Sequence, residues 1–228
     1  MPAANPRFPG FPRALMGFFE DLGRHNERSW FESRRSDYEK LYVEPARGFV
    51  SAIGPKLAKL APGVEAAPRV GGSIQRIHRD TRFSKDKTPY KTWLHFGFVP
   101  GKGEPGFFMR ISPASFGIGA GLFGFQPDQL ERYRAVVADP KRGAALQKTL
   151  AKAAKAWRYT PGEPQLKRVP RGLDPEHPHA ELLRYKGLFA GRETKPPAAL
   201  FGPKCVDFCL ERFRELRPVQ AWLVDALG

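Results

Sequence analysis

The segment from Arg76 to Lys91 concentrates side chains that can bind anions and transfer protons. Its sixteen residues include six lysines or arginines, two aspartates, a histidine and a tyrosine. Arginine presents a planar fork of donors that binds a phosphate or a carboxylate through two parallel hydrogen bonds. Several such cations in one segment can fix the position of a single anionic group. The sequence therefore predicts a pocket for a small phosphorylated or carboxylated ligand, lined by Arg76, Arg79, Arg82 and Lys87.

Three further groups complete this predicted site. We expect Asp80 to orient one of the arginines through a salt bridge and Tyr90 to supply a polar contact to the ligand. If the pocket is enzymatic, Asp80, His78 and Tyr90 are the nearby groups suited to proton transfer. A hydrogen-bonded histidine at the end of a strand is the alternative interpretation of His78. The sequence identifies no cofactor and leaves open whether a reaction takes place.

A structural role explains the same charges. Asp80 and Asp86 can hold the cations in a solvated network that fixes the loop, in which each exposed ion pair contributes about 0 to 1 kcal/mol. The two interpretations differ in geometry, because a binding site requires the side chains to converge on a concave surface.

The net charge of +15 points to a second class of function. The stretch from Arg69 to Lys91 holds seven basic residues against two aspartates, and the stretch from Lys141 to Arg171 holds nine against one glutamate. Clustering of this kind attracts phosphate groups. The alternative to a small-anion pocket is therefore a non-enzymatic nucleic-acid-binding protein that uses both basic regions as one surface. In the second region the exposed stripe would consist of Lys148, Lys152 and Lys155.

Two other motifs carry weaker signals. Residues 119–124 fit the dinucleotide pattern G-x-G-x-x-G, but that pattern requires an aliphatic parallel strand before the glycines. Here the glycines alternate within a strand of their own, so we expect no dinucleotide site. His177 and His179 flank a proline in a polar loop, and such a loop is more typical of a surface than of a metal site. We therefore expect no metal.

The cysteines and the apolar runs indicate the compartment. Cys205 and Cys209 are four residues apart in a helical pattern, which is a poor separation for a disulfide. The run from Ala14 to Phe19 is too short for a signal core, and no later stretch reaches membrane-spanning length. We expect a soluble cytoplasmic protein without a membrane partner.

The hydrophobic periodicity changes along the chain. Residues 14–25 show helical spacing, and Asn26 can cap a second helix that Pro45 interrupts. The middle alternates with the period of a strand, and helical spacing returns after Pro127. A further strand is predicted at residues 187–190, followed by a final helix in which Pro218 is an interruption.

The order of helices, then strands, then helices is typical of an α+β domain with an antiparallel sheet. We predict a single domain over residues 14–228, in which a mainly antiparallel sheet from roughly Ser73 to Phe123 packs against N- and C-terminal helices. Residues 1–13 hold four prolines and predict an extended arm. One face of the strand around residues 116–122 carries only glycines, so something must approach it closely, and a packed helix or a neighbouring side chain is favoured over a ligand.

The basic segment also carries a family resemblance. The pattern Arg-x-x-Arg-Asp-x-Arg-Phe at residues 76–83, followed by Lys87 and Tyr90, resembles the signature of the bacterial family catalogued as domain of unknown function 2461. The N-terminal Phe18 and Leu22, the residues around Asn26 and the glycine-rich strand resemble that family as well. The resemblance covers the full length and implies that the signature residues matter, without implying an activity.

Overall fold

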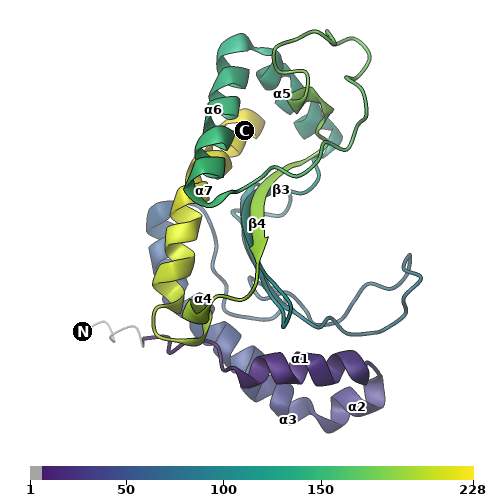
Figure 1. Ribbon diagram of the computed structural model, residues 1–228, viewed down its shortest axis with the longest axis vertical. Helices are drawn as coiled ribbons and strands as arrows, with labels where there is room; N and C mark the ends of the chain where they lie inside the picture. The colour runs from purple at the N-terminus through teal and green to yellow at the C-terminus, as the bar shows by residue number, and fades with distance from the viewer. Residues whose placement is uncertain (1–6) are drawn as a thin grey trace. The chain divides into compact units, whose positions relative to one another are not determined.

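The computed structural model describes residues 7–228 and has an α+β fold (Figure 1). Its four strands form one antiparallel sheet in the order β1-β2-β3-β4. This confirms the predicted fold class. Of the predicted N-terminal arm, residues 1–6 lie outside the described residues, while Phe8 and Phe11 are buried.

The helical elements and strands follow one another along the chain. The first helical group consists of α1 (Ala14–Arg24), α2 (Arg28–Ser33), α3 (Arg35–Asp37), the π-helix η1 (Tyr38–Val43) and α4 (Glu44–Leu60). The strands are β1 (Leu94–Phe98), β2 (Gly106–Ile111), β3 (Phe116–Leu122) and β4 (Leu188–Thr194). The later helices are α5 (Pro127–Ala138), α6 (Pro140–Trp157), the 3₁₀ turns η2 (Leu182–Arg184) and η3 (Ala198–Phe201), and α7 (Cys205–Leu227). Within residues 7–228, no helix is long and apolar enough to cross a membrane.

The chain divides into two compact units, and each unit contains residues of the strands. Unit 1 contains the described residues up to Phe98, together with Phe108–Gly117 and Glu193–Glu211. Unit 2 contains Val99–Phe107, Ile118–Arg192 and Arg212–Gly228.

An aromatic cluster forms the core of unit 1. The ring of Phe96 on β1 lies 5.1 Å from that of Phe49 on α4 and 6.0 Å from that of Phe11. The four apolar positions expected to face inward on α1 are all buried, namely Leu15, Phe18, Phe19 and Leu22. Burial of such rings removes large apolar areas from water and stabilises the unit. Cys205 and Cys209 of the same unit are buried free thiols, as their spacing predicts.

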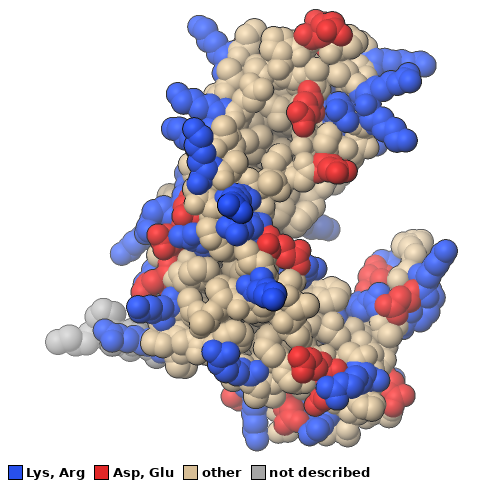
Figure 2. Space-filling model, in the orientation of Figure 1, with Lys and Arg blue, Asp and Glu red and all other residues tan. Residues whose placement is uncertain are grey.

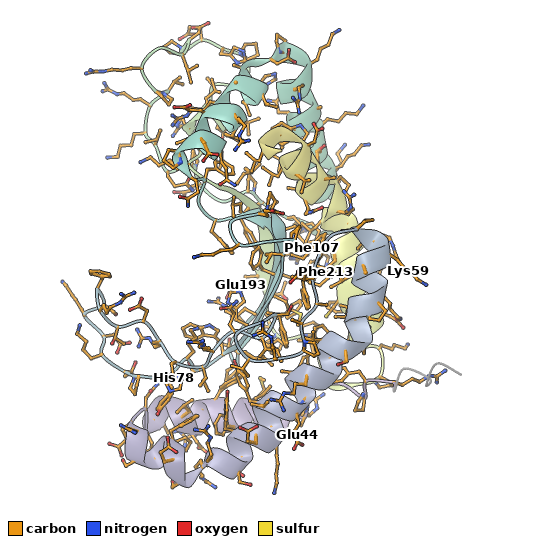
Figure 3. All side chains as sticks on the ribbon, turned by 180° about the vertical axis from the view of Figure 1, so that it is seen from behind. Glu44, Lys59, His78, Phe107, Glu193 and Phe213 are labelled. Carbon is orange, nitrogen blue, oxygen red and sulfur yellow. The ribbon has the colours of Figure 1, made fainter. Side chains whose placement is uncertain are left out.

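Unit 2 has its own core. The rings of Phe107 and Phe213 lie 5.1 Å apart and are labelled together in Figure 3. The buried Tyr133 on α5 donates a hydrogen bond of 3.0 Å to the carbonyl of Leu182. Tyr159, just after α6, donates one of 2.7 Å to the carboxylate of Glu215 on α7. These bonds satisfy polar groups that burial would otherwise leave unpaired.

Two prolines predicted to interrupt helices do not do so. Pro45 is the second residue of α4, and the chain passes into it directly from the wider turns of the π-helix η1. Pro218 lies inside α7, which continues to Leu227. Proline removes one hydrogen bond from a helix, but Leu216 and Val219 are fully buried beside it, and their packing holds the helix together.

The sheet begins later than predicted. In place of a strand starting at Ser73, residues 73–78 form only isolated bridges, of which one joins Ile74 to Phe96 and another joins His78 to Tyr90. The segment makes two backbone hydrogen bonds at β1, from Gln75 N–H to His95 O and from Gly97 N–H to Ser73 O. It then diverges from β1, so no continuous strand forms. The strand predicted at residues 187–190 is confirmed as part of β4 and joins the same sheet.

The bare face of β3 is covered by a neighbouring side chain, as predicted. A Cβ added at Gly119 would lie 2.3 Å from the Phe189 ring, and one added at Gly121 would lie 2.1 Å from the Leu188 carbonyl oxygen. Both glycines therefore allow β4 to approach closely. Because they belong to an antiparallel strand, the G-x-G-x-x-G pattern lacks the structural context of a dinucleotide site.

Candidate functional site

The predicted site segment folds back on itself like a hairpin. Arg79 N–H donates to the Pro89 carbonyl and Lys91 N–H donates to the Ile77 carbonyl, each at 2.8 Å. Residues 77–79 thus run antiparallel to residues 89–91, and the chain between them, residues 79–88, is here termed the basic loop. In Figure 1 this loop projects away from the helices of unit 1.

The base of the basic loop is anchored in the core. The side-chain amide of Asn26 donates to the Tyr90 carbonyl at 2.9 Å and accepts from the Tyr90 N–H at 3.0 Å. Asn26 therefore does not cap α2, whose N-cap position is Glu27. The Tyr90 ring is 4% exposed and stacks on Phe31 with a centroid distance of 4.1 Å. Tyr90 therefore holds the base of the loop as a core side chain, and burial raises the pKa of its phenol.

Inside the loop, Arg79 is held by its neighbours. Its guanidinium donates to the Asp86 carboxylate at 2.5 Å and to the Thr88 hydroxyl. The other carboxylate oxygen of Asp86 accepts from the Thr88 N–H at 2.9 Å. These hydrogen bonds, led by the one from the Thr88 backbone, lower the pKa of Asp86 to about 2.

Asp80 orients an arginine within the same loop. Its two carboxylate oxygens accept from Arg82 Nε at 3.0 Å and from Arg82 Nη2 at 2.7 Å. The side-chain hydrogen bond from Arg82 is the main cause that lowers the pKa of Asp80 to about 2. Lys87 donates to the Thr81 carbonyl at 2.8 Å. Arg79, Arg82 and Lys87 are therefore bonded to groups of the loop itself.

Two predicted residues meet side chains from elsewhere. Arg76 and His78 line a hollow of about 290 Å³ together with Arg35 of α3 and Arg47 of α4. We term this the arginine hollow. Figure 3 shows His78 at the base of the loop, next to the N-terminal helices. Glu39 is the acidic residue of the lining. The rest of the lining is mainly apolar and aromatic, and it is formed by Phe31, Tyr38, Val43, Val70 and Ile77.

The electrostatics of the arginine hollow favour an anion. Three arginines and one glutamate line the hollow, and Glu32 pairs with Arg35 at 3.8 Å, so the cations remain in excess. The Arg35 guanidinium lies over the rings of Phe31 and Tyr38, at 6.0 and 5.8 Å from their centroids. Burial, with the nearby charge of Glu39, raises the pKa of Tyr38 to about 12. The phenol thus stays neutral at physiological pH and adds no negative charge to the hollow.

Sequence reasoning missed Arg35 and Arg47. A signal for them exists, because Arg35, Glu39, Val43 and Arg47 recur at a spacing of four residues and all line the hollow. In an α-helix of 3.6 residues per turn, such a series drifts around the axis. The π-helix η1 has wider turns, which reduces the drift and keeps the four side chains on one face.

A second polar cluster lies on the sheet of unit 1. Arg110 of β2 bonds to Glu193 of β4 at 2.7 Å, and Figure 3 labels Glu193 there. The pair spans β3 at Gly117, where a Cβ would lie 4.0 Å from that of Arg110. Burial, together with the nearby charges of Lys91 and Arg110, lowers the pKa of His95 to about 4. His95 is therefore neutral at pH 7.

The remaining predicted groups lie in unit 2. The His177 and His179 rings are within hydrogen-bond distance of the Ala138 and Pro140 carbonyls, at 3.0 and 3.3 Å. In the part of the chain that the structure describes, no group of three potential metal ligands occurs. Basic side chains gather over α6 in Figure 2, and three lysines of this helix are exposed: Lys148, Lys152 and Lys155.

Comparison with known proteins gives the family of this chain. No curated protein and no solved structure matches it. The model of the family described as "Conserved hypothetical protein (DUF2461)" matches residues 14–222 of the 228. That range includes the arginine hollow, the basic loop and all four strands. The chain therefore belongs to the DUF2461 family.

Proposed function

We propose that this protein binds a small anionic ligand in the arginine hollow. The observation that carries the proposal is the meeting of Arg35, Arg47 and Arg76 around one concave surface. These residues come from α3, from α4 and from the base of the basic loop. Guanidinium groups repel one another and bind carboxylates and phosphates well. The convergence of three of them, with only Glu39 and Glu32 as nearby carboxylates, therefore favours an anionic partner.

The lining indicates the chemical class of the ligand. A phosphate or carboxylate group can accept paired hydrogen bonds from the guanidinium forks. Among the charged groups, Phe31, Val43 and Ile77 present apolar surface, and ligand sites typically combine such surface with a few polar groups. The hollow therefore suits a small phosphorylated or carboxylated molecule that also has an apolar or aromatic part.

The basic loop has a supporting role in this proposal. Arg76 and His78 belong to the antiparallel base of the loop, and the bonds of Arg79 to Asp86 and Thr88 fix the start of the segment that follows. A fixed loop base holds Arg76 and His78 toward the helices, which lowers the entropic cost of binding. Among the predicted ligand-binding residues, Arg76 is thus the direct contact.

A thermal-shift screen tests the proposal. Phosphorylated and carboxylated metabolites are screened against the wild type, and any stabilising compound is titrated against the double variant Arg47→Ala/Arg76→Ala. Hydrogen bonds to charged groups contribute about 1.5 to 3 kcal/mol each, so we expect affinity to fall by a factor of about ten or more. Arg82→Ala is the matched control, because it removes an arginine that pairs with Asp80.

The outcomes separate three possibilities. Loss of binding in the double variant, with binding retained in Arg82→Ala, supports the arginine hollow. If the double variant still binds and Arg82→Ala does not, the ligand binds at the basic loop and not in the arginine hollow. The absence of any stabilising anion contradicts the proposal.

One observation favours a second candidate, a nucleic-acid-binding function. Lys148, Lys152 and Lys155 are exposed on α6 and take part in no ion pair among the described residues. Unpaired lysines at helical spacing can contact successive phosphates, and such binding weakens steeply with salt. We rank it second because simple electrostatic attraction to nucleic acid is common among basic proteins.

A further inference from the structure

The tip of the basic loop exposes an aromatic ring. Phe83 is 95% exposed, compared with 60% for Phe123, the next most exposed large hydrophobic side chain in the described residues. A single exposed apolar side chain is ordinary on a protein surface. Phe83 differs because the loop that carries it is braced on both sides of the tip and is rich in cations.

The bracing restrains the loop backbone that carries the ring. Before the tip, Asp80 accepts three hydrogen bonds from Arg82, two from its guanidinium and one of 3.2 Å from its backbone N–H. After the tip, Lys87 reaches back to the Thr81 carbonyl at 2.8 Å, and Asp86 holds Arg79 at the loop base. Because the loop is already ordered, a partner that packs on Phe83 has to immobilise only its side chain.

Cations surround the exposed ring. The Arg82 guanidinium lies 5.8 Å from the centroid of Phe83, and its Nε and Nη2 atoms make the bonds to Asp80, which leaves Nη1 outside that pair. Lys85 and Lys87 follow the ring and are exposed. An aromatic ring with flanking cations is the arrangement that binds single-stranded nucleic acid, since a base stacks on the ring and the phosphates meet the cations.

We propose that Phe83 stacks on an unpaired nucleobase of single-stranded nucleic acid, with Arg82 and Lys85 contacting the flanking phosphates. Duplexes are poorer partners, because their bases are already stacked on one another. This inference does not depend on the arginine hollow, which is lined from the loop base by Arg76 and His78.

Other partners fit the loop less well. A membrane requires more apolar surface, because even one acyl chain gives only marginal binding, and Phe83 is the single large apolar side chain of residues 79–88. A protein groove normally receives a cluster of anchoring side chains. One ring among cations matches a base and its phosphates better than either of these.

Fluorescence anisotropy tests the proposal with three labelled probes: a short oligothymidylate, an abasic oligonucleotide of the same length, and a duplex. The abasic strand keeps the phosphates and lacks the bases. We expect the wild type to bind the oligothymidylate about 5- to 150-fold more tightly than the abasic strand, which is the range for one stacked base. Phe83→Ala should abolish this preference without changing duplex binding, and Phe83→Trp should retain it.

Phe123→Ala is the matched control, since it removes another exposed phenylalanine and should keep the preference. Phe83 lies in solvent, so its replacement should leave the thermal unfolding temperature unchanged, which excludes misfolding as a cause. Equal binding of the wild type to the oligothymidylate and the abasic strand, or an unchanged preference in Phe83→Ala, would overturn the proposal. Phe83-dependent binding to phosphatidylserine vesicles without a preference for bases would also overturn it, in favour of a membrane surface.

Discussion

The basic loop and helix α6 both carry clustered positive charge, but they use it differently. In the loop, Arg79, Arg82 and Lys87 are bonded to carboxylate, hydroxyl or carbonyl oxygens of the same loop. On α6, the lysines at 148, 152 and 155 are exposed and take part in no ion pair within residues 7–228. The first arrangement shapes the backbone and leaves Lys85 and the Nη1 atom of Arg82 outside these bonds, whereas the second leaves all three charges accessible to phosphates.

The difference follows from the acidic residues that accompany each cluster. The loop interleaves Asp80 and Asp86 with its cations, whereas the sequence of α6 contains no aspartate or glutamate. A count of positive charges therefore does not reveal what a basic region does. The positions of the neighbouring acceptors decide whether the charges brace the chain or remain available to a partner.

The largest expected effect concerns the anchor of the loop. Phe31→Ala removes a buried ring that stacks on Tyr90 and lies 5.2 Å from Tyr38. Removing such a ring typically costs about 3 to 5 kcal/mol, and we expect a decrease of that size in the free energy of unfolding, measured with urea. Lys148→Ala should change it by less than about 0.5 kcal/mol. If Phe31→Ala lowered the free energy of unfolding as little as Lys148→Ala does, the base of the basic loop would not be part of the core.

A smaller decrease is expected when Asn26 is replaced. Asn26→Ala leaves the N–H and carbonyl of Tyr90 without their side-chain partner, and an unsatisfied buried polar group costs about 1 to 3 kcal/mol. Asn26→Asp keeps the acceptor for the N–H but lacks the donor, so its urea denaturation midpoint should lie between those of the wild type and the alanine variant. Equal midpoints for the three proteins would contradict the anchoring role.

Acid should loosen the loop before it affects the middle of α6. The hydrogen bonds to Asp80 and Asp86 lower the pKa of each from 3.8 to about 2. A lowered pKa means that the stabilisation is fully present above 3.8 and is lost as the pH falls toward 2. Amide hydrogen exchange should show loss of protection at Arg82 and Thr88 within that window. Simultaneous loss in the loop and in the middle of α6 would indicate global unfolding instead.

The smallest effect on stability is expected on α6. Replacing Lys148, Lys152 and Lys155 together with glutamine should change the free energy of unfolding by less than about 0.5 kcal/mol, because both residue types favour helices similarly. If these lysines bind phosphates, the dependence of duplex affinity on salt concentration should become shallower, by about 0.9 in the logarithmic slope for each phosphate that is no longer neutralised. An unchanged slope would show that the helix carries solvated charge alone.

The fold class, most of the helices and the location of the basic segment could be predicted from the sequence alone. These features depend on the period of apolar residues and on neighbours a few positions apart, such as Asp80 and Arg82. Local spacing also explains why α6 presents its lysines to solvent. The full-length resemblance to DUF2461 is confirmed by the family match over residues 14–222.

Tertiary structure decided which charges meet. Asn26 and Tyr90 are 64 residues apart. The sequence around either residue does not indicate that the side-chain amide of Asn26 bonds with the backbone of Tyr90. Arg76 likewise joins Arg35 and Arg47 only because the loop base packs against the N-terminal helices. The sequence indicates how each side chain is placed within its own element. Contacts between distant elements depend on how their surfaces fit together, which periodicity does not encode.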